Sequence, residues 1–132
     1  MSVIPEKYMD LMTGKKAFGD LATVMRDGSP QVTPVWFDYK NGAIRVNTAR
    51  GRVKDKNMAV RAKVALAIMD PANPYRHIQI RGRVKRVTEE GADAHIDLLA
   101  KKYLDQDTYP FRNAADKRVI YEIEPTSCSV MG

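Results

Sequence analysis

Two dipeptides, Asp27-Gly28 and Asn41-Gly42, place the strongest constraint on what this chain can fold into. Both pairs tolerate the positive backbone φ that a tight hairpin turn demands. They divide residues 17–49 into three apolar, β-rich runs that are separated by short polar turns. This arrangement predicts three consecutive antiparallel strands joined as a meander.

The second of these runs carries two prolines, Pro30 and Pro34. Proline has no amide hydrogen for a strand ladder, so it is confined to an edge, a bulge or the start of a strand. We therefore expect the second run to depart from a neighbouring strand and to open a gap there. Trp36, the only tryptophan, follows directly. It lies either beside a pocket for a flat ring or, as is more frequent for tryptophan, in the core.

The remainder of the chain alternates between apolar runs and segments with helical spacing. Ile78, Ile80 and Val84 alternate with polar residues, as in a strand with one buried face. The apolar residues of 89–104 recur at the spacing of one helix face, behind Thr88 as an N-cap. The expected elements are a short helix around 5–13, a helix over 51–60, strands over 63–70 and 77–87, a helix over 89–104, and a last strand over 118–124 that Pro125 ends.

Six strand-like runs with two or three helices predict a mainly β fold, a six-stranded antiparallel barrel with short helices at its ends. An open ferredoxin-like sandwich is the alternative, but its strand order fits poorly because three strands precede the first internal helix. The length suits one domain, so we assign residues 1–132 to a single unit. The first residues lack the apolar core of a signal peptide, and no apolar stretch is long enough to span a membrane. We expect a cytoplasmic protein.

Positive charge is concentrated in one part of the sequence. Lys and Arg outnumber Asp and Glu by 22 to 16, which gives a net charge of +6. This balance suits an anionic ligand, nucleic acid or a membrane surface. Residues 45–63 hold seven of the basic residues and a single acid, Asp55. The same stretch has no aromatic residue for base stacking, which argues against nucleic acid.

The basic stretch falls where the third run ends, near Thr48, and a helix opens after Gly51. A helix N-terminus carries unpaired amides and partial positive charge, and neighbouring Arg or Lys side chains strengthen its attraction for phosphate. The residues alone leave two interpretations open. The junction is either a phosphate site or a basic surface helix without a ligand.

Side chains for acid, base or nucleophilic catalysis form no familiar motif. His77 and His95 lie on separate predicted elements, without a carboxylate motif to orient either. Cys128 is the single cysteine, has no partners at metal-binding spacing, and suits a packing role. We predict no metal site and leave the catalytic residues unassigned. Any chemistry is expected to reside in a bound cofactor.

Three motifs occur in order: LATVMRDGSPQVTPVWF, NTARGRVKDKN and DPANPYRHIQIRG. Through them, residues 17–87 resemble the split β-barrel flavin and deazaflavin oxidoreductases, the relatives of pyridoxamine 5′-phosphate oxidase. The similarity is greatest to the branch that uses the deazaflavin coenzyme F-420. The resemblance implies the FMN-binding split-barrel fold and a homodimer with cofactor sites at the subunit interface.

The resemblance also implies roles for individual residues. Arg52 and Lys54 would grip the cofactor phosphate, while Arg50 and Lys56 would be free to reach an acidic tail or solvent. The implied cofactor-binding residues are Thr33, Pro34, Val35 and Trp36 along the ring; Asn47, Thr48, Ala49, Gly51, Arg52, Lys54 and Asn57 around the phosphate; and Tyr75, Arg76 and Gln79 from the second subunit.

The implied reaction is hydride transfer between coenzyme F-420 and an electron-poor organic acceptor such as an enone, a quinone or a tetrapyrrole. A broad basic rim favours F-420, whose phosphate continues into an acidic tail, over FMN, which ends in a single phosphate. The alternatives are an FMN-binding oxidoreductase of the same fold and a non-enzymatic flavin or haem carrier. The expected partners are a second copy of the chain and the small-molecule acceptor, with neither nucleic acid nor membrane.

Overall fold

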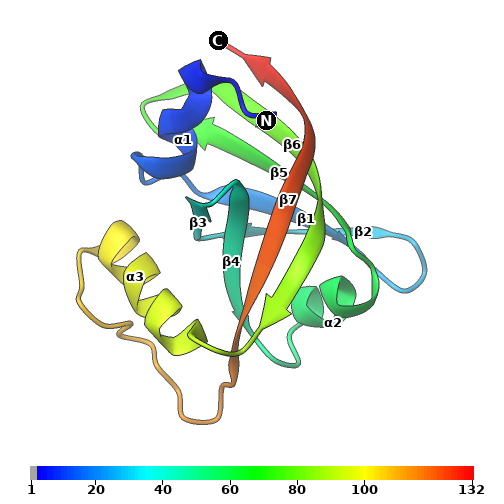
Figure 1. The fold of residues 1–132 in the computed structure, drawn as a ribbon, viewed down its shortest axis with the longest axis vertical. Helices are drawn as coiled ribbons and strands as arrows, with labels where there is room; N and C mark the ends of the chain where they lie inside the picture. The colour runs from blue at the N-terminus through cyan, green and yellow to red at the C-terminus, as the bar shows by residue number, and fades with distance from the viewer. Residues whose placement is uncertain (1–2) are drawn as a thin grey trace.

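The computed structural model describes residues 3–132, which form a curled antiparallel sheet with short helices around it (Figure 1). The strand order in the sheet is β2-β1-β5-β6-β7-β4-β3. The predicted mainly β split barrel is confirmed. The elements are η1 (Glu6–Tyr8), α1 (Met9–Thr13), β1 (Gly19–Val24), β2 (Pro30–Val35), β3 (Phe37–Lys40), β4 (Ala43–Ala49), α2 (Val53–Val60), β5 (Lys63–Asp70), β6 (Asn73–Thr88), α3 (Ala92–Leu104) and β7 (Arg118–Met131).

The second predicted run divides at Trp36 into two strands, so the sheet has seven strands and not the six expected. Its first half, β2, pairs with β1, whereas its second half, β3, pairs with β4. The two halves lie at opposite edges of the strand order although only one residue separates them in the chain. The prediction that this run leaves its neighbour is confirmed. The strand count was wrong because one run serves two different partners.

Both predicted hairpin turns are present. Gly28 has a φ of 90°, and Asn41 and Gly42 have φ values of 54° and 78°, in the left-handed region that these residue types tolerate. The Asp27 carboxylate accepts hydrogen bonds from the amide and the hydroxyl of Ser29 at 3.0 and 2.6 Å. These local contacts fix the registers of β1 with β2 and of β3 with β4.

The last strand runs further than the sequence indicates, because β7 passes through Pro125, where we expected it to end, and continues to Met131. The missing amide is tolerated at this point since the ladder with β6 shifts register where Pro125 meets Gly82. Pairing of β7 with β4 has already ended at Ile123. The close crossing requires glycine, since a Cβ at Gly82 would lie 2.8 Å from the Glu124 carbonyl oxygen.

Helix α3 begins at Ala92, later than predicted, behind Gly91 with its φ of 76°. Thr88 ends β6, and its hydroxyl accepts a hydrogen bond from the Glu90 amide at 3.1 Å instead of capping the helix. The predicted apolar face is confirmed, since it buries Ala92, Ile96, Leu99 and Tyr103. Within residues 3–132, no helix is long and apolar enough to cross a membrane.

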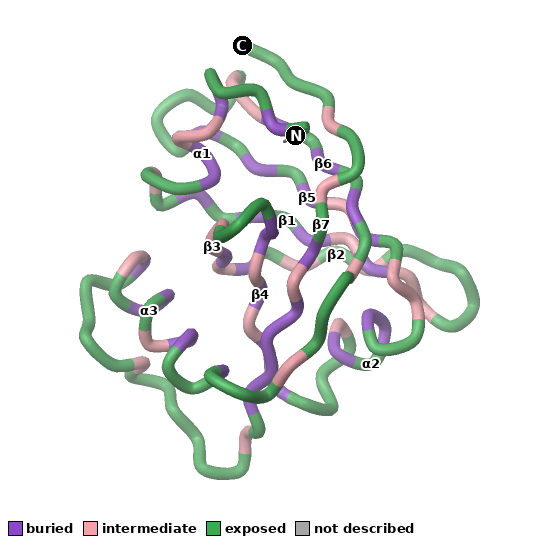
Figure 2. Tube along the Cα trace, in the orientation of Figure 1, coloured by how far each residue is buried: buried purple, intermediate pink, exposed green. Residues whose placement is uncertain are grey.

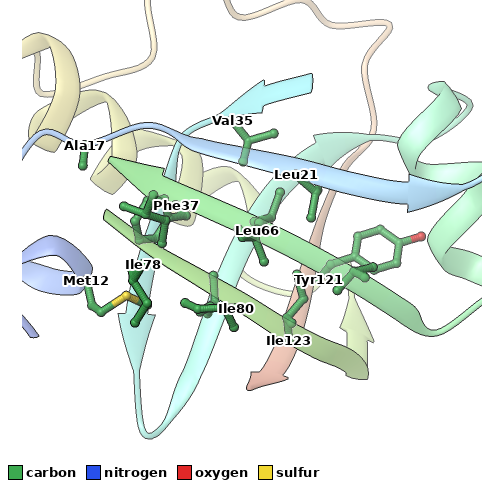
Figure 3. Packing of buried hydrophobic residues seen from close by; sticks show 14 of the residues in the cluster. Met12, Ala17, Leu21, Val35, Phe37, Leu66, Ile78, Ile80, Tyr121 and Ile123 are labelled. Atoms are coloured by element: carbon green, nitrogen blue, oxygen red, sulfur yellow. The ribbon is translucent and has the colours of Figure 1, made fainter. Parts of the chain in front are cut away.

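The main core lies inside the curl of the sheet, where the buried segments of the strands face one another (Figure 2). Phe37 and Tyr121 are its largest fully buried side chains, and Leu21 and Leu66 pack beside them (Figure 3). Burial of each such side chain contributes about 1.5 to 3 kcal/mol. A smaller apolar cluster lies under α3 and contains Ile96, Leu99 and Tyr103, with Trp36 and Tyr109 packed against it.

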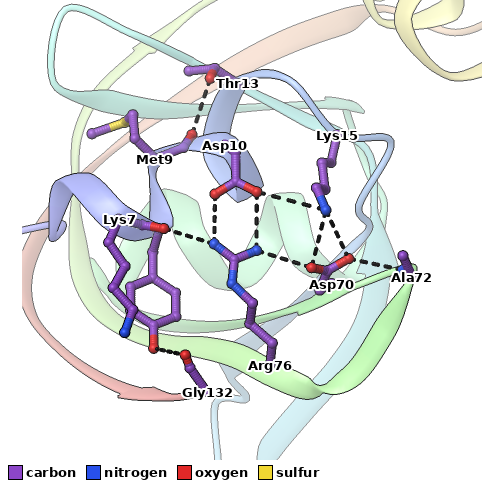
Figure 4. A network of polar contacts seen from close by, with 10 residues as sticks. Lys7, Met9, Asp10, Thr13, Lys15, Asp70, Ala72, Arg76 and Gly132 are labelled. Atoms are coloured by element: carbon purple, nitrogen blue, oxygen red, sulfur yellow. Dashed lines mark hydrogen bonds and ion pairs between the residues drawn. The ribbon is translucent and has the colours of Figure 1, made fainter.

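A network of charged side chains fastens the N-terminal helices over one end of the barrel (Figure 4). Arg76 of β6 donates to Asp10 at 2.7 and 3.0 Å and to Asp70 at 3.0 Å. Lys15 donates to the same Asp70 carboxylate at 3.1 and 3.2 Å. The Tyr8 hydroxyl donates to the carbonyl of the last residue at 2.8 Å. The last of these contacts holds the C-terminal residue beside the N-terminal helices (Figure 1).

Candidate functional site

The junction between β4 and α2 is organised around the carboxylate of Asp55, which is 5% exposed. It accepts hydrogen bonds from the Gly51 amide at 2.8 Å, from Arg50 at 3.1 Å and from the Tyr121 hydroxyl at 2.6 Å. Burial by itself would raise the pKa of Asp55, but these hydrogen bonds hold that pKa below its usual value. The ionised carboxylate therefore fixes the loop that precedes α2.

Arg50 does not have the role expected of it. Its guanidinium donates to Asp55 at 3.1 Å and to Glu89 at 2.8 Å. Because both contacts tie the loop to other parts of the chain, Arg50 is not free to reach an anionic tail. Lys56, by contrast, is exposed on α2.

Three cations converge beside the start of α2. Lys54 is half-buried, and among residues 3–132 its side-chain ammonium has no hydrogen bond or ion pair shorter than 4 Å. Burial lowers the pKa of Lys54, and the nearby charges of Arg52 and Arg118 lower it further. Arg52 makes only a 3.5 Å contact to Asp116, and its side chain is 50% exposed. An ammonium that is partly desolvated beside two guanidinium groups favours a bound anion.

The helix itself adds to this site. Arg52 occupies the N-cap position of α2 with extended backbone angles, and no side chain caps the first turn. First-turn amides have no partner within their own helix and carry the positive end of its dipole. An uncapped helix N-terminus with two adjacent cations is an arrangement that binds phosphate.

The sequence alone does not point to Arg118. It starts β7 and pairs with Ala49 at the end of β4, which carries its side chain to the same junction from the other end of the chain. No local pattern marks it, since an arginine at the start of an apolar run is common. Only the strand register shows that it joins Arg52 and Lys54.

Asn47 lies on the side of β4 that faces α3. Its amide group donates to the Ala92 carbonyl at 2.8 Å and contacts the His95 ring at 3.2 Å. His95 in turn contacts Asp38 at 3.1 Å. Burial would raise the pKa of Asp38, but the hydrogen bonds from His95 and Arg45 lower it to about 2. This buried network holds α3 against β3 and β4, and it gives His95 a structural role.

Asn57 lies on the side of α2 that faces β1. Its amide group donates to the Thr23 hydroxyl at 3.0 Å, and its carbonyl accepts from Arg61 at 3.2 Å. Asn57 thus braces α2 against β1, and its side chain does not reach the loop before the helix. The hydroxyls of Thr33 and Thr48 are buried and have no hydrogen-bond partner within residues 3–132. Unsatisfied buried hydroxyls are unusual and call for an explanation.

The segment that divides β2 from β3 lies beside aromatic side chains. Trp36 stacks on Tyr103 with ring centroids 5.3 Å apart and meets the edge of Tyr109 at 6.0 Å. Pro34 is exposed, whereas Val35 is 7% exposed and belongs to the main core. One face of Trp36 is therefore already covered, and Val35 presents no side chain to the surface.

Tyr109 connects this aromatic group to the basic junction. Its ring lies 6.0 Å from that of Trp36 and 5.0 Å from the guanidinium carbon of Arg118. Trp36 and the β4–α2 junction are thus linked through the segment that follows α3. Together with the neighbouring residues 33–35 they form the candidate site.

Tyr75, Arg76 and Gln79 lie away from that site within one chain. Tyr75 is 77% exposed, and Arg76 is held in the network of Figure 4. Gln79 lines a surface cavity of about 480 Å³ on the outer side of the sheet, with Asp20 and Cys128. A contribution from these residues to the candidate site requires a second copy of the chain.

A second, larger surface cavity of about 890 Å³ lies beside β5 and β6, next to Arg61 and Gly82. Its lining includes the apolar residues Ala22, Val24, Val64 and Ala65. In the described part of the chain, no three His, Cys, Asp or Glu side chains come together as metal ligands. Neither cavity contains Arg52 or Lys54, so the basic junction is a separate feature.

A curled antiparallel sheet split within a single run, with a basic strand-to-helix junction, defines a split β-barrel protein of the flavin and deazaflavin type. More particularly, the chain belongs to the pyridoxamine 5′-phosphate oxidase family, whose model matches residues 4–132. No curated protein matches the chain.

Solved structures agree with this assignment. A structure described as an F-420 reductase is 34% identical, with a TM-score of 0.84, and the match covers 96% of this chain and 98% of that one. A putative pyridoxamine 5′-phosphate oxidase from Listeria innocua is 16% identical, with a TM-score of 0.72 and 95% coverage of both chains. A conserved hypothetical protein from Mycobacterium tuberculosis is 20% identical, with a TM-score of 0.74, over 98% of this chain and 86% of that one. The latter two show the fold alone.

Proposed function

We propose that this chain binds coenzyme F-420 and acts as an oxidoreductase on an electron-poor organic acceptor such as an enone, a quinone or a tetrapyrrole. One observation carries the proposal: the β4–α2 junction joins an uncapped helix N-terminus to Lys54, a half-buried ammonium without a close partner in residues 3–132. The similarity to a structure described as an F-420 reductase supports this choice of cofactor.

The residues of the junction fit a phosphate-bearing cofactor. Lys54 and Arg52 hold the phosphate together with the amides of the first turn of α2. Asp55 does not touch the ligand in this arrangement; it fixes the loop through Gly51 and Arg50. The unpaired hydroxyls of Thr33 and Thr48 mark polar groups that a ligand or a second subunit would satisfy. Ala49 lies at the strand end and contributes its main chain.

The aromatic group shapes the other end of the site. When bound, a deazaflavin or flavin supplies hydride transfer through its ring system. Trp36 and Pro34 border the space for that ring, and the stack of Trp36 on Tyr103 keeps the indole in one orientation. The protein's part is to bind, to orient the ring and to exclude water, and none of the described side chains is needed as a hydride carrier.

We further propose a homodimer in which the second subunit completes the site. The outer face of β1, β2, β5 and β6 exposes Val32 by 60% and Met69 by 49%, and apolar side chains that share one exposed face suit an interface. Gln79 lines the cavity on this face, and Tyr75 is exposed at the end of the same strand, β6. Sedimentation of the purified protein should give twice the monomer mass of 14.9 kDa. A monomer at micromolar concentration would rule out the shared site.

Titration of the purified protein with F-420 and with FMN tests the cofactor. We expect saturable binding of F-420, followed by its absorbance and fluorescence. An FMN-binding oxidoreductase is the alternative, favoured by the match to the pyridoxamine 5′-phosphate oxidase model. Tight binding of FMN without binding of F-420 would establish that alternative. Cofactor binding without turnover of any acceptor would instead indicate a non-enzymatic carrier.

A double variant tests the phosphate site. Replacing Arg52 and Lys54 by alanine should weaken cofactor binding by about 1.5 to 3 kcal/mol for each charge-assisted hydrogen bond that the substitution removes. Lys40→Ala is the control, since it removes a positive charge at an exposed position at the end of β3, outside the junction. Equal affinity of the folded double variant and the control would remove the phosphate assignment.

A further inference from the structure

A buried cation next to the proposed phosphate site lacks a close partner. The Arg118 side chain is only 8% exposed, yet its nearest acceptors are Asn47 at 3.5 Å and an Asp116 oxygen at 3.9 Å. Charge-assisted hydrogen bonds to guanidinium are about 2.7 to 2.9 Å long. Since a guanidinium has five donors and desolvation penalises an uncompensated charge, Arg118 is poorly satisfied by the chain alone.

A cavity of about 160 Å³ lies beside this guanidinium, between α3 and the segment that leads to β7. Arg118, Ile96, Tyr109 and Ala114 are among the residues that line it. The guanidinium lies over the Tyr109 ring, with its central carbon 5.0 Å from the ring centroid. This contact with the π-face of the ring provides no lone-pair acceptor such as a carboxylate or carbonyl oxygen, so it does not replace the hydrogen bonds that the N–H groups of Arg118 lack.

The charges around the cavity favour a singly charged, planar anion. Arg112 is engaged with Asp97 at 2.6 Å and with Asp93 at 3.6 Å. Asp116 contacts Arg52 at 3.5 Å. With Asp93 and Asp116 at its rim, the cavity is a poor place for a phosphate dianion. A carboxylate matches the fork of a guanidinium in two parallel hydrogen bonds and adds only one negative charge.

We propose that this cavity binds a carboxylate group through Arg118. The inference deepens the proposed function, and it rests on that function only where it joins the carboxylate site to the phosphate site. Arg118 pairs with Ala49 at the end of β4, and Arg52 and Arg118 both contact Asp116, at 3.5 and 3.9 Å, so the two sites adjoin and suit a single ligand that carries a phosphate and a carboxylate. The carboxylate belongs either to such a cofactor or to a free organic acid that binds beside it.

Side-chain NMR of the ligand-free protein tests the site directly. Glutarate, added at neutral pH and constant ionic strength, should shift the Nε–H signal of Arg118 in a saturable way. Inorganic phosphate should instead shift the amides of Val53 and Lys54. A glutarate titration that leaves the Arg118 signal in place would overturn the inference.

Two variants separate the cavity from the fold. Arg118→Gln should weaken glutarate binding about 10-fold to 100-fold, the effect of removing a charge-assisted hydrogen bond. Ala114→Leu fills the cavity from an exposed position and leaves Arg118 in place, so it should abolish the glutarate shift in a folded protein. Persistence of that shift in Ala114→Leu would place the glutarate elsewhere and refute the assignment.

The two proposals fail in different ways. Phosphate shifts at Lys54 with no glutarate shift at Arg118 would remove the carboxylate site and leave the phosphate site intact. The reverse result would remove the phosphate site and leave the carboxylate site. Cofactors then identify the source: if F-420 shifts Arg118 and FMN does not, the carboxylate is on the cofactor. If neither cofactor shifts Arg118 but glutarate does, the site takes a free organic acid.

Discussion

Replacing Asp55 by alanine is expected to loosen the β4–α2 junction and to lower the free energy of unfolding by about 2 to 4 kcal/mol. The variant removes three hydrogen bonds to a buried carboxylate, each worth about 1.5 to 3 kcal/mol. The full sum is not expected, because two of the partners can compensate. The Tyr121 hydroxyl keeps its bond to the residue 55 carbonyl at 3.0 Å, and Arg50, with a side chain 37% exposed, can turn to water.

Urea unfolding and thermal melting followed by circular dichroism measure this effect. For a chain of this length, the melting midpoint should fall on the order of 10 °C. Asp55→Asn keeps one acceptor but loses the charge, so it should fall between Asp55→Ala and the wild type. Tyr121→Phe, which removes one of these donors, should cost about 1.5 to 3 kcal/mol. Lys56→Ala, exposed on the same helix, should stay within about 0.5 kcal/mol.

Phosphate affinity gives an independent test of the role of Asp55 in positioning the loop. Because Asp55 positions the loop without touching the ligand, Asp55→Ala should weaken binding at the junction even at temperatures where the variant is fully folded. If Asp55→Ala keeps wild-type stability and wild-type affinity, the carboxylate does not organise this loop, and the physical basis given for the site is wrong.

Other parts of the fold give three further predictions. Gly82→Ala should cost about 1 to 3 kcal/mol of stability, because the added Cβ would lie 2.8 Å from the Glu124 carbonyl oxygen; Gly14→Ala, whose nearest contact is 3.8 Å, should melt almost as the wild type does. The pKa of Asp70 is held at about 2, first by a backbone amide and then by two cations, against the effect of burial. Because this pKa is depressed in the folded state, the stability it provides is present above the unfolded value of about 3.9 and is lost as the pH falls toward 2. In Asp70→Asn, the urea unfolding midpoint should therefore change less with pH over that range than it does in the wild type. Burial raises the pKa of Tyr103 to about 12, and its hydroxyl donates to a main-chain carbonyl at 2.7 Å, so Tyr103→Phe should lower the melting midpoint by the equivalent of about 1 to 2 kcal/mol.

Elements that depend on local chemistry could be predicted from the sequence. The Asn41-Gly42 turn needs only the positive φ that these two residues tolerate. The strand Lys63–Asp70 was predicted with its observed bounds, because an apolar run between two turn signals admits few other interpretations. The burial of Ile78 and Ile80 on one face of β6 followed from simple alternation.

Features that depend on partners distant in the chain could not be predicted. The two prolines of the second run predict that it leaves its neighbour, but not that β1 and β4 take its two halves. The sequence also predicts that the last strand ends at Pro125, but β7 passes it because its ladder with β6 shifts register there. The role of Arg50 is set by Glu89, which is far away in sequence.

The residues of the candidate site likewise fall into those that the sequence indicates and those that only the fold brings together. Arg52 and Lys54 are visible from the sequence because a basic stretch coincides with the start of a helix. Arg118 reaches the junction only through the register of β7 on β4, and Tyr109 reaches it through the fold of the segment after α3. The contact of Arg52 and Lys54 with a cofactor remains a prediction. The neighbouring Arg118 adds a third position at which that prediction can be tested.

The prolines of β2 bear on how copies of this protein can meet. β2 is an edge strand, and the main-chain groups of its residues 30, 32 and 34 point to the same side. Pro30 and Pro34 are paired with β1, and the nitrogen of a paired proline faces away from the partner strand, so this side is the open edge of the sheet. A further strand added at this edge would find an amide only at Val32, between Pro30 and Pro34. The opposite edge, β3, is four residues long and ends in Lys40. Both edges therefore resist the strand-to-strand joining that leads to aggregates.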